Sequence, residues 1–374
     1  MIKNRVLLCS AIFLLALYGC SRNNISSNPA AGAATVPPQG VNNPPPGANT
    51  GASSLPGDTK VPVTWSNLNL SGRLVYTVAG ILNNQLLAEV QVLDLASGEI
   101  KTIFQTPNAG WVDGVTVSPD NKQLILSYTP PTSVPSHGGI DTLYIMPLDG
   151  SQPPQLLLTP PPATEGYFEP EWSPDGKYVY FAQFDYSSPT NYELMRVAYP
   201  NGEAEKVAEK AFWPRISNDG SALVYTSTAT GVNTLVVSKA DGSGAQQVPL
   251  TGPYIPQTIV SPLFLADDQS ILFSAPNLGQ AFTPNWVDKV FGIMEASADG
   301  TITSDWWSVP RSGGTPKRVT HFQSLWLFAR LSPDKNHLVG YSADGITIMN
   351  PDGSGVVQVL NYTGGQPGTV NWIP

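Results

Sequence analysis

The sequence predicts an all-β protein, a six-bladed β-propeller in which strands from the two chain ends share one blade. Three observations predict this fold. A turn motif recurs along the chain, a run of strand-forming residues follows each copy, and the two ends carry complementary pieces of one further unit. The composition agrees, because 34 glycines and 36 prolines beside only 13% charged residues are typical of a turn-rich β protein.

The first 20 residues have the features of a lipoprotein signal. Lys3 and Arg5 precede an apolar run, residues 6–17, that is too short to cross about 30 Å of hydrocarbon but suits a signal-peptide core. The sequence Leu-Tyr-Gly-Cys that ends at Cys20 resembles a lipobox. We therefore expect a signal peptide over 1–19 and a lipidated Cys20 that anchors the protein outside the cytoplasmic membrane or at the outer membrane. An ordinary signal peptide and an uncleaved anchor are the alternatives.

Residues 20–60 are expected to form a disordered tether. Residues 21–60 contain seven prolines, many Gly, Ala, Ser and Asn residues, and no aromatic residue. Such a segment buries too little apolar surface to offset its chain entropy. A flexible coil of this length spans roughly 35 Å, which is enough to lift the following domain, residues 61–374, off a membrane.

The propeller prediction rests on five copies of a turn motif. The copies centre on Asp120, Asp175, Asp219, Asp268 and Asp334. In the fullest copy, Trp172 to Lys177, the order Ser-Pro-Asp-Gly describes a type I turn, with proline presetting φ at the second position. The runs LILSY, YVYFA, ALVYT, ILFSA and HLVGY follow the motifs and have strand composition. Two further strands complete most units, and four antiparallel strands per unit make a propeller blade.

The chain ends supply the sixth blade. Residues 71–76 look like a second strand without a first, and residues 370–374 look like a first strand that stops at its turn. Together they complete one blade and close the ring, which removes the free sheet edges of an open array.

The Trp-Ser-Pro-Asp-Gly-Lys signature, followed by endings of the type Leu-Tyr…Asp-Gly…Leu-Thr, resembles the TolB-type propeller repeats of bacterial envelope proteins. The resemblance covers about residues 70–374, and the N-terminal domain that TolB carries has no counterpart. It implies the fold and an envelope location, and it leaves the partners open.

Each inner strand is expected to place one residue on the channel, two positions before the motif serine. These channel residues are Thr116, Glu171, Arg215, Phe264, Arg330 and Asn371, with Asp113 and Glu169 nearby. Two interpretations stay open. The charged residues line a polar mouth that binds an anionic or peptide ligand, or Glu171 and Arg215 pair across successive blades and lock the ring. We favour the second, because a partly buried charge needs a partner.

An insertion at about 277–304 has no equivalent in the other units. Thr283 and Pro284 predict the start of a short helix whose apolar face includes Trp286, Val290, Phe291 and Met294. This face either packs on the propeller or binds a partner.

No catalytic constellation emerges from the sequence, and we expect neither a metal nor another cofactor. The three histidines are scattered, with His137 and His321 in loops, and the two cysteines lie at positions 9 and 20. The net charge of −9 and the lack of a basic cluster exclude nucleic acid as a partner.

We therefore expect a propeller scaffold, lipid-anchored to the membrane, that binds an envelope protein or a cell-wall component. The alternative is a carbohydrate-active or lactone-hydrolysing enzyme that uses mouth carboxylates or His137 and His321 with a divalent metal.

Overall fold

The computed structural model describes residues 59–82, 85–134, 138–188, 191–253, 255–276, 304–322, 324, 327–342, 345–361 and 366–374. The signal, Cys20, the tether up to residue 58, His137 and the insertion residues 277–303 lie outside this range. Among the described residues the regular structure is β-strand apart from one 3₁₀ turn, η1 (Ser66–Leu68). No helix in this part of the chain is long and apolar enough to cross a membrane.

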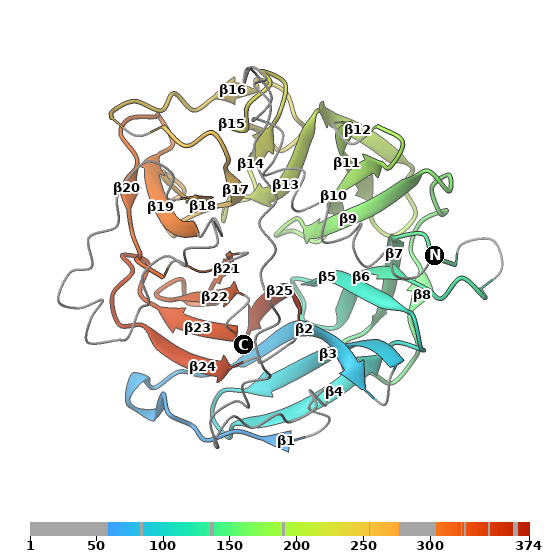
Figure 1. Cartoon of the computed structure of the whole chain (residues 1–374). Helices are drawn as coiled ribbons and strands as arrows, with labels where there is room; N and C mark the ends of the chain where they lie inside the picture. The colour runs from blue at the N-terminus through green and yellow to red at the C-terminus, as the bar shows by residue number, and fades with distance from the viewer. Residues whose placement is uncertain are drawn as a thin grey trace, which may run out of the picture.

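Six sheets form a closed ring around a central axis (Figure 1). Five are four-stranded antiparallel sheets built from consecutive strands, which we number as blades 1 to 5 in chain order: β5–β8, β9–β12, β13–β16, β17–β20 and β21–β24. Blade 6 has the strand order β1-β4-β3-β2-β25 and therefore combines both chain ends. The predicted six-bladed propeller is confirmed.

The inner strands surround the axis, and each contacts the inner strand of the next blade. They are β5 (Trp111–Val117), β9 (Glu165–Trp172), β13 (Ala211–Ile216), β17 (Val260–Phe264), β21 (Phe328–Leu331) and β25 (Gln366–Ile373). The second strands are β6 (Gln123–Thr129), β10 (Tyr178–Asp185), β14 (Ala222–Ser227), β18 (Ser270–Pro276), β22 (Leu338–Ser342) and, in blade 6, β2 (Arg73–Leu82).

The outer half of each blade consists of a third and a fourth strand. The third strands are β7 (Thr142–Pro147), β11 (Tyr192–Ala198), β15 (Thr234–Lys239), β19 (Ser304–Pro310), β23 (Gly345–Met349) and β3 (Gln85–Asp94). The fourth strands are β8 (Gln155–Leu156), β12 (Ala204–Glu209), β16 (Gln246–Gln247), β20 (Lys317–Arg318), β24 (Val357–Asn361) and β4 (Glu99–Gln105), with β1 (Thr59–Lys60) added outside β4.

The repeated motif forms the turn between the first and second strands, as its chemistry predicts. In blade 2, the Ser173 hydroxyl donates to the Asp175 carboxylate at 2.7 Å and accepts the backbone N–H of Tyr178 at 2.9 Å. The same two contacts, a serine hydroxyl that donates to an aspartate and accepts an N–H across the turn, recur in blades 1, 3 and 5. These turns occupy one face of the disc, which we call the turn face. The opposite face, where the inner strands begin, we call the loop face.

The ring closes as the sequence predicts. Strand β25 pairs with β2, and Trp372 lies opposite Leu74 in the antiparallel register. The indole N–H of Trp372 donates to the carbonyl of Ser71 at 3.0 Å. Closure requires a glycine at position 72, because φ there is +89° and a Cβ would lie 2.2 Å from the carbonyl oxygen of Ile373.

The hydrophobic core is divided among the blade interfaces. Each pair of adjacent blades shares an apolar cluster, for example Tyr180 and Leu194 of blade 2 with Leu223 and Tyr225 of blade 3. Equivalent clusters fill the other five interfaces. The blades therefore hold one another in place, and the residues on the axis need not carry the stability of the ring alone.

Candidate functional site

The channel residues occupy equivalent places in five blades. In the register of each inner hairpin, Thr116 lies opposite Ile125 and Glu171 opposite Tyr180. Arg215, Arg330 and Asn371 take the corresponding positions in blades 3, 5 and 6. Because side chains alternate along a strand, equal distance from the turn places these residues at one level of the channel.

Blade 4 requires a correction. The backbone N–H of Leu265 donates to the carbonyl of Ser270, the bond that the motif serine makes in the other blades. Asp268 has φ +52° and occupies the position of Gly176, so Asp267 rather than Asp268 corresponds to the motif aspartate. The channel residue of blade 4 is therefore Leu263, and the expectation of Phe264 is wrong. The alignment slipped by one residue because this copy has lost both serine and proline.

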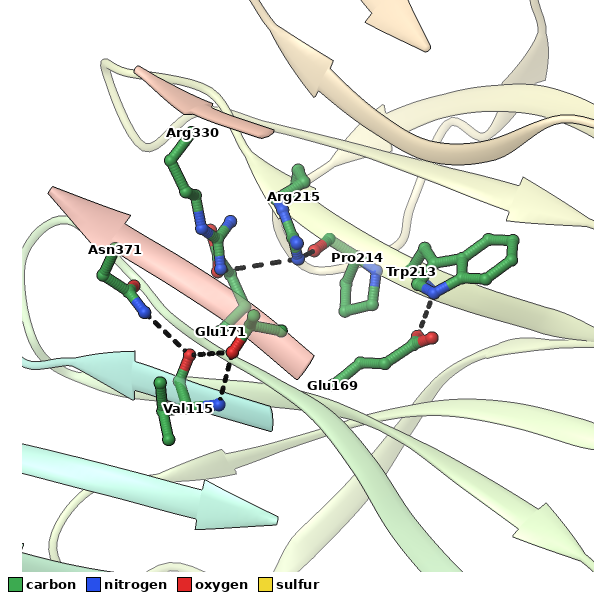
Figure 2. Close-up of polar contacts among 9 residues, drawn as sticks. Val115, Glu169, Glu171, Trp213, Pro214, Arg215, Arg330 and Asn371 are labelled. Carbon is green, nitrogen blue, oxygen red and sulfur yellow. Dashed lines mark hydrogen bonds and ion pairs between the residues drawn. The ribbon is translucent and has the colours of Figure 1, made fainter. Parts of the chain in front are cut away.

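Glu171 is the centre of the charged cluster. Its Oε2 lies 2.7 Å from Nη2 of Arg330 and 3.7 Å from Nη1 of Arg215. Figure 2 shows both guanidinium groups converging on this carboxylate. The pairing of Glu171 with Arg215 on the next blade is as we favoured, but the closer partner is Arg330 in blade 5. Blades 2 and 5 are three places apart in a ring of six, so this ion pair crosses the axis.

Asn371 and its strand neighbour Thr369 hold blade 6 against blade 1. Asn371 donates from Nδ2 to the carbonyl of Val115 at 2.9 Å (Figure 2). Thr369, on the same strand, accepts the N–H of Val115 at 2.6 Å through its hydroxyl. Thr116 is buried. The structure therefore gives Asn371 a role in joining the ends of the ring.

A second layer, nearer the loop face, is built from β-bulges. Glu169, Trp213 and Ser261 have φ values of +54°, +53° and +48°, and each precedes a proline. Each stands where its inner strand slips register against the second strand. Left-handed backbone at residues with side chains costs free energy and concentrates at functional sites. A proline just before the channel residue, as in Glu-Pro-Glu and Trp-Pro-Arg, is the sequence signal from which this layer could be predicted.

Glu169 links the bulges of two blades. Its Oε2 accepts the backbone N–H of Trp213 at 2.6 Å (Figure 2). Burial raises the pKa of Glu169 to about 7, in spite of this hydrogen bond and the nearby Arg215 charge, which both lower it. Burial likewise lowers the pKa of Arg215 to about 10, and the positive charge of Arg330 adds to that effect. The channel is thus poorly solvated, and the pKa of each charged group there is shifted by its charged neighbours.

Asp113 belongs to a separate pair of carboxyl groups between blades 1 and 2. Trp111 donates its indole N–H to Asp113 Oδ1 at 2.9 Å. Burial and the neighbouring carboxyl of Asp141 raise the pKa of Asp113 well above its ordinary value. Asp141 in turn accepts hydrogen bonds from the hydroxyls of Thr129 and Tyr186. Sequence reasoning missed Asp141, because it lies in the connection before β7 and belongs to no repeated motif.

None of the other residues that the sequence suggested as functional is described at this site. His321 is exposed beyond β20, and the four insertion residues Trp286, Val290, Phe291 and Met294, like His137 and Cys20, lie outside the described residues. Within the described part of the chain, no group of three His, Cys, Asp or Glu side chains could hold a metal ion.

Comparison with known proteins identifies the fold. No family model and no curated protein matches the sequence. TolB from Acinetobacter baumannii is similar in structure, with a TM-score of 0.57 at 16% identity over 80% of this chain and 66% of that one. The chain therefore spans about two thirds of that protein's length.

Two further solved structures agree. A putative TolB from Agrobacterium tumefaciens has a TM-score of 0.51 at 17% identity, covering 82% of this chain and 100% of that one. A chain of a nidogen/laminin complex has a TM-score of 0.52 at 10% identity, covering 80% and 97%. Identities this low establish the architecture alone. The chain is therefore a six-bladed β-propeller with the fold of the TolB structures.

Proposed function

We propose that this protein is a lipid-anchored envelope scaffold whose propeller binds a protein partner on its loop face. The observation that carries the proposal is the difference between the two faces. Apart from residues 61–72, the turn face carries only short connections, namely the internally hydrogen-bonded motif turns and the links from third to fourth strands. The loop face carries most of the longer connections between strands, such as residues 130–141, 157–164 and 248–259, and the ends of strands β18 and β19 that flank the insertion. Binding residues are disproportionately found on loops held by a rigid scaffold.

Aromatic side chains strengthen the case for a protein partner. A continuous row runs across the loop-face ends of blades 2 and 3, with ring centroids 4.6 to 5.3 Å apart between successive members: Tyr186, Phe184, Tyr192, Phe212 and Trp213. Tyr186 and Tyr192 are only half-buried. Tyrosine and tryptophan are enriched where protein surfaces bind one another.

The place where the tether joins the disc leaves the loop face free. Strand β1 is the outermost strand of blade 6 (Figure 1), where Lys60 pairs with Glu99 at the start of β4. A fourth strand starts at the turn face, so the N-terminal segment joins the rim of the disc near that face. A lipid on Cys20 would attach the propeller through a tether that joins the disc away from the loop face, so the tether would not cover that face. The fold shared with TolB is consistent with an envelope location.

Site-specific photo-cross-linking in envelopes tests the docking face. A photoreactive residue at Ser187, exposed on the loop face, should give a discrete adduct with a partner, whereas the same residue at Lys122, beside a motif turn, should not. Deleting residues 277–303 should weaken the Ser187 adduct if the insertion contributes. Adducts from Lys122 alone, or equal adducts from both positions, would contradict the proposal.

The anchor is tested separately with Cys20→Ser. The wild-type protein should incorporate labelled fatty acid and sediment with membranes, and the variant should do neither. Labelling of the variant, or its unchanged sedimentation, would refute lipidation at Cys20.

One observation favours the second candidate, a carbohydrate-active or lactone-hydrolysing enzyme. Asp113 has a raised pKa beside the carboxyl of Asp141. Enzymes that hydrolyse glycosides use such a pair, in which one protonated carboxyl acts as the general acid beside a second carboxyl group. Turnover of envelope glycans or lactones by the purified propeller, abolished in Asp113→Asn, would establish this function. Equal rates in wild type and variant would remove it.

A further inference from the structure

The charges at the channel level do not balance. Arg215 and Arg330 face a single carboxylate, that of Glu171, and this carboxylate sits closer to Arg330 by about 1 Å, at 2.7 against 3.7 Å. The other channel residues at this level, Thr116, Leu263 and Asn371, are uncharged. The two guanidinium groups thus share one carboxylate at this level, and Glu169, whose pKa burial raises to about 7, is the other negative group that acts on Arg215.

Arg215 also has unused hydrogen-bonding capacity. Its side chain is only 7% exposed, and its Nη1 donates to the carbonyl of Pro214 at 2.8 Å. Its Nε is buried and has no hydrogen-bond partner among the described residues. A buried donor without an acceptor costs about 1–3 kcal/mol, and more when the donor is charged. The geometry therefore points to a missing acceptor beside Arg215.

We propose that the channel of this propeller binds one carboxylate group of a peptide partner, held by Arg215 with Arg330 beside it. The proposal rests on the docking function above and names the chemical group that the partner supplies. The source is either an Asp or Glu side chain or a C-terminal carboxylate, and both have the planar pair of oxygens that matches a guanidinium fork.

The surroundings select a singly charged ligand. Two guanidinium groups and one carboxylate meet at this level, and Glu169, only partly ionised near neutral pH, is the other negative group near Arg215. A phosphate dianion would bring a second negative charge toward these carboxylates, whereas a carboxylate brings the one that is missing. Cationic ligands are disfavoured by the guanidinium groups themselves. The chemistry thus favours a carboxylate over a phosphate or an amine.

Acetate is the first probe, because it is the smallest carboxylate and needs no peptide contacts. The thermal midpoint of the purified propeller should rise saturably with sodium acetate above the response to sodium chloride at equal ionic strength. Arg215→Gln should abolish the difference. Arg196→Gln, which removes a guanidinium paired with Glu205 on the outer strands of blade 2, is the matched control and should keep the full response.

Glu171→Gln is the variant expected to change acetate binding most clearly. It removes the internal carboxylate that competes for the two guanidinium groups, so acetate should bind at least tenfold more tightly and recover part of the stability that the substitution costs. If Arg215→Gln fails to fold, Arg215→Lys keeps the charge but removes the Nε donor, and its acetate response should fall at least tenfold.

Two peptides identify the source of the carboxylate. Acetyl-Gly-Asp-Gly-amide presents a side chain, acetyl-Gly-Gly-Gly with a free terminus presents a C-terminal carboxylate, and acetyl-Gly-Asn-Gly-amide is the neutral control. Binding of either acidic peptide, lost in Arg215→Gln, supports the proposal. It is overturned if acetate and chloride act equally on wild type and Glu171→Gln, if Arg215→Gln keeps the response, or if neither acidic peptide binds. Cross-linking from Ser187 can succeed in any of these cases, so failure here leaves the docking function standing.

Discussion

Glu171 and Arg330 belong to opposite blades of the ring, yet their side chains meet at 2.7 Å across the axis. Only the inner strands of a narrow channel bring opposite blades this close. Arg215 approaches the same carboxylate from a third blade, so one glutamate connects three of the six blades. This arrangement explains why charge appears at equivalent positions of blades 2, 3 and 5.

We expect Arg330→Met to destabilise the propeller by about 2–4 kcal/mol, because Glu171, 13% exposed, loses its closest partner and stays poorly solvated. The free energy of unfolding in urea measures the effect. Lys177→Met is the control, since Lys177 pairs with Asp175 at 3.1 Å on the surface, where such pairs contribute less than about 1 kcal/mol. Equal losses in the free energy of unfolding would show that the Glu171–Arg330 pair contributes no more to stability than a surface pair.

The stability of the propeller should fall as pH rises from about 4.5 to 7. Burial raises the pKa of Glu169 from 4.5 to about 7, so in this window the folded state binds more protons than the unfolded state. Stability from this group is fully present below pH 4.5 and is lost above 7. Glu169→Gln should flatten the dependence, measured as thermal midpoint against pH.

The control for this pH dependence is Glu209→Gln. The Lys206 ammonium lowers the pKa of Glu209, so its contribution has the opposite sign and lies at lower pH. This variant should keep the slope of the wild type between pH 5 and 7. A slope that survives in Glu169→Gln would place its origin in another group, such as Asp113.

Gly72→Ala should damage ring closure. The substitution combines a positive φ of +89° with a Cβ only 2.2 Å from the carbonyl oxygen of Ile373, on the strand that closes blade 6. Gly231→Ala is a matched control, because φ there is +84° and no atom lies within 4 Å of the added Cβ. We expect about 1 kcal/mol of destabilisation at position 231 and at least about 2 kcal/mol more at position 72. Equal thermal midpoints for the two variants would contradict the closure argument.

Asp305→Ala should cost about 3–5 kcal/mol. Asp305 is completely buried at the start of β19, where it accepts the backbone N–H of Phe322 at 2.6 Å and pairs with Arg318. Removing it leaves the Phe322 N–H without its acceptor and the Arg318 guanidinium without its counter-ion, with the Thr320 carbonyl as its remaining acceptor. Lys317→Ala, an exposed neighbour on β20, should shift the urea midpoint little. A small effect at position 305 would show that water replaces the carboxylate.

Local chemistry explains why the blades could be predicted. The turn at Ser173 and Asp175 is formed by side chains that hydrogen-bond to groups two to five residues away. Six consecutive residues therefore determine its geometry. Where a copy lost those letters, at residues 265–268, the prediction slipped by one position. The pairing of β2 with β25 was predictable for the same reason, since each end carried a recognisable half of the repeated hairpin.

The candidate site was predictable only in part. Equivalent positions identified Glu171, Arg215 and Arg330, and adjacency of blades predicted the first two as a pair. The closer pairing with Arg330 depends on the width of the channel, which no motif encodes. Asp141 joins Asp113 only because the connection before β7 meets the first residues of β5 near the loop face, and the hydrogen bond from Trp213 to Glu169 depends on bulges in two blades.

The sequence alone determined the number of blades, the position of their turns and the way the ring closes, because these follow from contacts between residues close in the chain and from repetition. Which charges meet on the axis, and that Arg215 is left with an unused donor, was decided by the tertiary structure. Ring closure sets the distance between opposite inner strands, and burial raises the free-energy cost of a charge that is not balanced by a partner.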